Sequence, residues 1–148
     1  AMLSRAENNT EENDGQVMAE AQYMSGAALV LLDRAEEGKE RIEKAVMFYD
    51  AYDRSEFYRD AAMAHAFLAM AYGYLEPPGK QELLEQGELA LSYFTQLETV
   101  DSEDIECIWG IQFILQRGHA EAFSVEKGRE FKVWFDDILR LNGAKYID

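Results

Sequence analysis

The tetrad IEKA at residues 42–45 recurs as LEQG at residues 84–87 and as VEKG at residues 125–128, at spacings of 42 and 41 residues. Each copy has an aliphatic residue, then glutamate, then a polar residue and a small residue. The same spacing aligns three aromatic residues further along the chain, Tyr52, Phe94 and Phe135. This shared register predicts an internal repeat of about 42 residues, a length typical of stacked helical hairpins.

The residues around the tetrads carry a helical pattern of hydrophobicity. Apolar side chains recur three and four positions apart, as at Phe67, Met70 and Tyr74, which places them on one face of a helix. Runs of alternating β-branched residues, which typify strands, do not occur in the sequence. The pattern predicts six helices, at residues 16–34, 38–54, 56–75, 80–99, 102–116 and 123–141. The predicted fold class is therefore all-α, with three stacked antiparallel helical hairpins, and a compact helical bundle is the alternative.

The first 15 residues differ from the rest of the chain. They are polar and acidic and lack apolar periodicity, so we expect a disordered N-terminal tail at residues 1–15. Residues 16–148 are predicted to form a single helical-repeat domain, because a chain of this length can bury a core without disulfides. Asp101 or Ser102 is placed to cap the helix that the pattern begins at residue 102.

Composition argues against several classes of partner. The chain has 14 basic and 29 acidic residues and a formal net charge of −15, which repels phosphate backbones, so we expect no nucleic-acid binding. The longest apolar stretch, residues 61–75, is shorter than the ~18–20 residues of a spanning helix, so we expect no membrane insertion. No basic segment followed by an apolar one opens the chain, and the predicted location is the cytoplasm. The periplasm or a membrane tether is the alternative if a leader precedes Ala1.

The middle hairpin resembles the tetratricopeptide (TPR) repeat family. The sequence LAMAY at residues 68–72 is similar to the family's Leu-Gly-x-x-Tyr core in the first helix. Ala90, Phe94 and Leu97 are similar to the small, aromatic and apolar positions of its second helix. The likeness covers about residues 16–141, although the family's period is about 34 residues and its closing proline is missing here. The resemblance implies a right-handed superhelix, whose first helices line a concave groove for a peptide or a partner helix.

Within that groove, the resemblance places one apolar stripe on the first helix of each hairpin. The positions that we single out for partner binding are mostly apolar and all uncharged: Met24, Met63, Met70, Tyr74, Ile108, Gln112 and Gln116. Methionine side chains are flexible and adapt to varied apolar partners. The same spacing also suits ordinary core positions, so core packing is the competing interpretation. The predicted function is a protein–protein interaction module, either an adaptor or a small chaperone.

The sequence does not support a catalytic or metal site. Neither His65 nor His119 follows a glutamate by three positions, as di-iron bundles require. The single cysteine, Cys107, lies beside acidic residues that raise a thiol pKa, so we expect a structural role. We therefore predict no enzyme activity, no metal and no cofactor. The alternative function is a small-ligand-binding helical bundle, with a pocket lined by Tyr23, His65, Tyr72 and Cys107.

The last predicted helix, at residues 123–141, has a broad apolar face. Its aromatic residues are Phe131, Trp134 and Phe135. As the terminal element it has no following neighbour, so it either caps the stack or presents these aromatics to a partner or a second subunit. A subunit of a homo-oligomeric assembly, such as a homodimer, is therefore a further alternative.

Overall fold

A computed structural model describes the backbone of residues 2–118 and the side chains of residues 11–108, 110 and 111. This part of the chain is helical and contains no strand, which confirms that it is all-α. Its elements are α1 (Met2–Leu31), α2 (Ala35–Ala51), the 3-10 helix η1 (Ser55–Phe57), α3 (Tyr58–Tyr74), α4 (Lys80–Thr95) and α5 (Ser102–Gly118). Apart from the start of α1, the five α-helices match five predicted ranges to within four residues. The sixth range, 123–141, lies outside the described residues.

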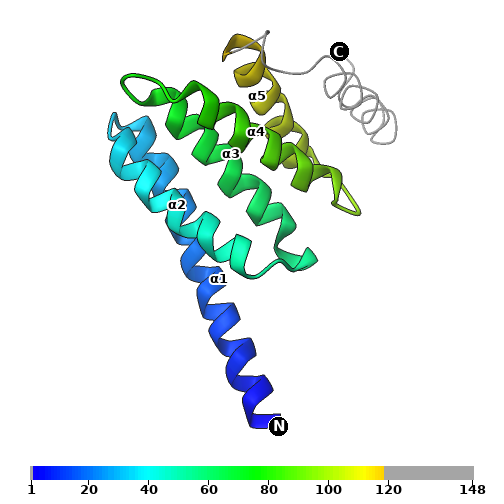
Figure 1. Cartoon of the computed structure of the whole chain (residues 1–148). Helices are drawn as coiled ribbons and strands as arrows, with labels where there is room; N and C mark the ends of the chain where they lie inside the picture. Colours follow the sequence, from blue (N-terminus) through cyan, green and yellow to red (C-terminus); the bar gives the residue numbers. More distant parts are fainter. Residues whose placement is uncertain (1, 119–148) are drawn as a thin grey trace.

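The first helix begins well before the predicted residue 16. Figure 1 shows the N-terminal turns of α1 extending away from the other helices, where the sequence predicted a disordered tail. Two contacts join the end of this N-terminal extension to the other helices: Glu12 pairs with Arg54, and the ring of Phe48 packs against Gly15. Lengthening a helix that already exists adds one hydrogen bond per residue without a new nucleation cost. Residues 2–15 therefore continue α1 despite their lack of apolar periodicity.

A left-handed turn ends α1, and α2 then runs antiparallel to α1. Asp33 has a φ of 66°, its N–H donates to the carbonyl of Val30 at 3.2 Å, and the Arg34 N–H donates to the carbonyl of Leu29 at 2.9 Å. These two bonds form the Schellman motif that commonly satisfies the last carbonyls of a helix. α1 and α2 consequently form an antiparallel hairpin.

Two glycines let the backbones of α1 and α2 approach closely. A Cβ on Gly38 would lie 2.5 Å from the carbonyl oxygen of Gly26 and 2.7 Å from Val30 Cγ2. A Cβ on Gly26 would lie 2.6 Å from Ile42 Cγ1. The crossing of this hairpin is thus set by the absence of two side chains.

The third helix is the centre of the described fold, since it contacts α1, α2, α4 and α5. Its small side chains divide between two core clusters. Those in the cluster with α4 and α5 are Ala62, Ala66 and Ala69, and those in the cluster with α1 and α2 are Ala61, Ala64 and Ala71. Alanine on opposite faces lets α3 lie between neighbours on both sides. No described helix is long and apolar enough to cross a membrane.

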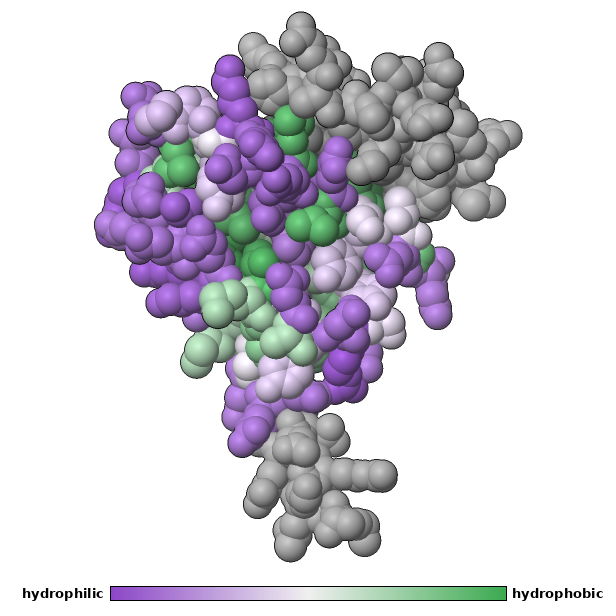
Figure 2. Space-filling model, in the orientation of Figure 1, coloured by the Kyte–Doolittle hydropathy of each residue, from purple (hydrophilic) through white to green (hydrophobic). Residues whose placement is uncertain are grey.

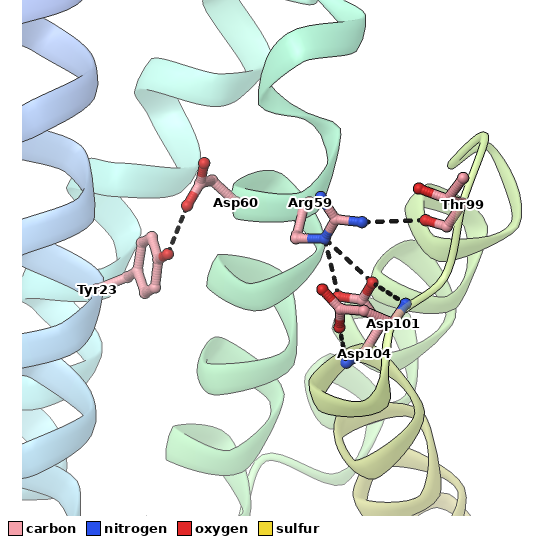
Figure 3. Close-up of polar contacts among 6 residues, drawn as sticks. All are labelled: Tyr23, Arg59, Asp60, Thr99, Asp101 and Asp104. Atoms are coloured by element: carbon pink, nitrogen blue, oxygen red, sulfur yellow. Dashed lines mark hydrogen bonds and ion pairs between the residues drawn. The ribbon is translucent and has the colours of Figure 1, made fainter.

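A reciprocal pair of hydrogen bonds starts α5. The Asp101 N–H donates to Asp104 Oδ2 at 3.0 Å, and the Asp104 N–H donates to Asp101 Oδ1 at 2.9 Å, as Figure 3 shows. The Nε–H of Arg59, on α3, donates to both carboxylate oxygens of Asp104, at 3.0 and 3.1 Å. Nη2 of Arg59 donates to the carbonyl of Thr99. This arrangement is a capping box with aspartate in the third position, and it confirms the predicted cap at Asp101.

Replacing Asp104 with alanine is expected to lower the free energy of unfolding by about 2–3 kcal/mol, because both the cap and the ion pair are lost. Arg59 is half-exposed and regains water, which keeps the cost below that of a fully buried pair. Glu103→Ala, at the exposed neighbouring position, is the control and should cost less than about 1 kcal/mol. Urea denaturation measures both. Equal effects would show that the capping box contributes nothing.

Candidate functional site

The outer face of α1 carries a line of apolar side chains. They recur four and three positions apart and comprise Val17, Ala21, Met24, Ala28 and Leu31, all of which are exposed. Met18 and Leu32 flank this line, and every large apolar member of the group is more than half exposed. We call these seven residues the α1 stripe.

The α1 stripe lies opposite the face that α1 buries. Ala19, Tyr23 and Val30 face the core with α2 and α3, so the helix is apolar on two opposite sides. A surface helix normally has polar residues on its outer side. Here Glu20 is the one charged residue from position 16 to position 32, in a chain with a net charge of −15. An exposed apolar surface of this kind typically marks an interaction site.

Hydrophilic residues predominate on the face of the molecule that Figure 2 shows, and hydrophobic residues form several separate patches among them. Beyond the α1 stripe, the large exposed apolar side chains of the described residues occur singly, at Met47, Tyr52, Tyr74 and Leu89. Scattered apolar residues are ordinary on protein surfaces, whereas a continuous stripe is not.

The residues predicted to bind a partner lie in different environments. Met24 and Tyr74 are exposed, whereas Met63 and Met70 are partly buried against the core. Gln112 and Gln116 lie on α5 among residues of which the structure describes the backbone alone. Phe131, Trp134 and Phe135 lie outside the described residues.

The predicted groove does not continue to α5. Ile108 is fully buried in the core with α3 and α4, which removes it from the predicted binding surface. Its counterparts at the same position of the predicted repeat are Ala66, which is buried, and Met24, which is exposed. Among the described helices, α2 and α3 pack on the opposite side of α1, whereas the corresponding positions of α3 and α5 face the core. Of these three residues, Met24 alone faces outward.

His65 is buried in a polar contact between helices. Its Nδ1 lies 2.6 Å from Gln86 Oε1, and its ring stacks on Tyr93 at 5.5 Å between ring centroids. Nε2 has no hydrogen-bond partner and lies 3.5 Å from Asp50 Oδ1. A general acid or base must reach a substrate within hydrogen-bond distance, and this ring is covered instead. The geometry therefore supports a structural histidine.

The four residues predicted to line a ligand pocket make separate contacts: Tyr23 with Asp60, His65 with Gln86, Tyr72 with Glu43, and Cys107 with the core of α3, α4 and α5. Among the residues whose side chains are described, no group of three or more histidine, cysteine, aspartate or glutamate residues is arranged to hold a metal ion.

Part-buried hydrogen bonds to the carboxylate of Asp60 join α1 to α3. The Tyr23 hydroxyl donates to Asp60 Oδ1 at 2.6 Å (Figure 3), and the Gln16 amide donates to Asp60 Oδ2 at 2.8 Å. Burial, together with the Asp60 carboxylate, raises the pKa of Tyr23, and burial likewise raises the pKa of Tyr49 beside it. These contacts hold α1 in one orientation, with its apolar stripe outward.

The thiol of Cys107 is held in its protonated form. Burial, and secondarily the carboxylate of Asp104, raises its pKa to about 12. The thiolate is the reactive form of cysteine, so this side chain is a poor nucleophile at neutral pH. This agrees with the structural role expected from the acidic sequence around it.

Stability is expected to fall as the pH rises from about 9 to about 12. In the unfolded chain Cys107 ionises near its ordinary value of 9.0, whereas the folded chain holds the proton up to about 12. The unfolded state therefore loses this proton first and is favoured in that window, and Tyr23 and Tyr49 act in the same direction at higher pH. Melting curves by circular dichroism should show the fall, and Cys107→Ala should lessen it. An identical fall in this variant would rule out the thiol as a cause.

No protein family, curated protein or solved structure matches the chain.

Proposed function

We propose that this protein is a protein-binding helical module, acting as an adaptor or small chaperone, and that the α1 stripe docks an amphipathic helix. The observation that carries the proposal is the stripe itself, which is apolar, exposed and almost free of charge in a strongly acidic chain. Burying such a surface against a partner releases water without separating any ion pair. The covered histidine and protonated thiol favour binding over catalysis.

We further propose that the helices form a TPR-like stack of hairpins. In support, α1 packs with α2 and α3 with α4, while α1, α3 and α5 contact one another in succession. In such a stack, α1 lies at one end of the described hairpins, and no described helix covers its outer face. A surface helix normally has a polar outer side, so the apolar outer face of α1 favours contact with a helix that the described residues do not supply.

The spacing of the stripe suits a helix more than an extended peptide. Alternating steps of four and three residues form the a and d positions of a coiled-coil seam, with Val17, Met24 and Leu31 on one set and Ala21 and Ala28 on the other. A helix with the same spacing places its side chains into the holes of this seam. The small alanines permit a short distance between the two axes.

The proposal is tested by capture from native lysate with a tagged chain. The stripe variant is Met24→Glu/Leu31→Glu, and the matched control is Met47→Glu on α2, where the native methionine lies outside the stripe and is at least as exposed as Met24 and Leu31. We expect the stripe variant to lose at least about 90% of the captured partner, since a charge in an apolar contact is costly. The control should keep it. Equal capture by all three chains, at matched melting temperatures, would contradict the proposal.

A further inference from the structure

We propose that the helix docked on the α1 stripe is the α1 helix of a second copy of this chain, packed antiparallel to the first. This inference rests on the proposed function, because it names the occupant of the same surface. A homodimer through α1 differs from one through residues 123–141, which the sequence alone suggested.

The stripe is complementary to itself in the antiparallel direction. Antiparallel coiled coils pair each a position with a d position of the other helix. When Met24 of one copy lies opposite Ala28 of the other, Ala21 lies opposite Leu31. Each of these layers then contains one large side chain and one alanine, and the two-fold axis makes each layer occur twice. Val17 lies opposite position 35, beyond the end of α1, and adds no layer. A parallel pair would instead place large opposite large and alanine opposite alanine, which packs unevenly.

The flanking residues agree with the same register. Met18 of one copy lies opposite Leu32 of the other, which extends the apolar contact on one edge of the seam. Arg34 lies beyond the left-handed turn at Asp33 and pairs with Glu37 in its own chain, so it does not continue the seam. Glu20 is exposed beside the seam. The apolar layers therefore carry the proposed register.

The fold leaves room for this contact. The two-fold axis passes near residue 26, and Gly26 itself faces α2 on the opposite side of the helix. Described contacts to α1 come from α2 and α3, both on that buried side. Two copies of a chain with a charge of −15 repel one another, so self-association needs an almost uncharged surface. The α1 stripe supplies one.

The first experiment measures mass by sedimentation equilibrium over a range of chain concentrations. The native chain and Met47→Glu are expected to reach twice the chain mass of 16.9 kDa. Met24→Glu is expected to remain at the single-chain mass, with unchanged helicity. A native chain that stays monomeric throughout overturns the inference. A dimer that persists in Met24→Glu overturns it as well, because the contact then lies elsewhere.

The second experiment tests the register with cysteines in a Cys107→Ala chain, using a short bismaleimide crosslinker. Ala21→Cys and Leu31→Cys chains, one of them carrying a tag, are expected to crosslink when mixed, and neither is expected to crosslink with itself. Self-crosslinking of both single variants would indicate a parallel pair and overturn the proposed arrangement. If the chain is monomeric but capture from lysate still depends on Met24 and Leu31, the second copy is excluded while the docking function stands.

Discussion

Replacing Gly38 with alanine is expected to lower the free energy of unfolding by about 2 kcal/mol or more, although alanine favours helices over glycine by about 1 kcal/mol. The added Cβ would lie 2.5 Å from a backbone oxygen of α1, and backbone cannot move aside as a side chain can. α1 and α2 must separate, which loosens the contacts of Val30 and Ile42. Urea or thermal denaturation measures the change.

Gly110→Ala is the matched control for this prediction. Gly110 lies within α5, and a Cβ there would meet nothing within 4 Å. The same substitution should therefore stabilise the chain by up to about 1 kcal/mol through helix propensity alone. Opposite signs at the two sites would confirm that the α1–α2 crossing depends on a missing side chain. Stabilisation at both sites would contradict the close approach of the two helices.

Replacing Ile108 with alanine is expected to cost about 2–5 kcal/mol, whereas Met24→Ala should change stability by less than about 0.5 kcal/mol. The two residues occupy the same position of the predicted repeat, but Ile108 is 0% exposed and Met24 is 55% exposed. Removing Ile108 leaves a cavity among Phe94, Ile105 and its other neighbours. Removing Met24 deletes atoms that water already surrounds.

This pair of variants distinguishes a core residue from a surface residue at the same position of the predicted repeat. If Met24→Ala were as costly as Ile108→Ala, α1 would be covered in solution and the exposed stripe would not exist in the free chain. In a dimer through α1, Met24→Ala should weaken association while it leaves the stability of the single chain unchanged. Measuring both variants at low and high chain concentration distinguishes these cases.

Much of the helical pattern could be predicted from local sequence. Five of the helices follow the spacing of apolar residues, and Asp101 supplies the cap of α5 as its side chain suggests. The start of α1 could not be predicted in this way. Its first 15 residues have no apolar face, and their helix depends on continuity with residue 16 onward and on Arg54 and Phe48, which are distant in sequence.

The exposed site could be predicted only in part. The predicted repeat gives Met24, Ala66 and Ile108 equivalent positions, and sequence alone gives them the same role. Their exposure differs because it depends on which helices pack alongside, and the described neighbours of α1, α2 and α3, lie on the side away from Met24. The sequence does carry one signal of this difference, since residues 16–32 contain a single charge whereas surface helices usually contain several.

The central claim, that the α1 stripe docks a helix, is tested most directly by a photoreactive amino acid placed at Met24. The same amino acid at Met47 is the control, and the crosslinked peptides are identified by mass spectrometry. We predict that position 24 joins to a defined helical peptide, and to residues 21–31 of a second copy if the dimer forms, while position 47 gives no such product. Absence of a defined product at position 24, or the same products from both positions, would contradict the claim.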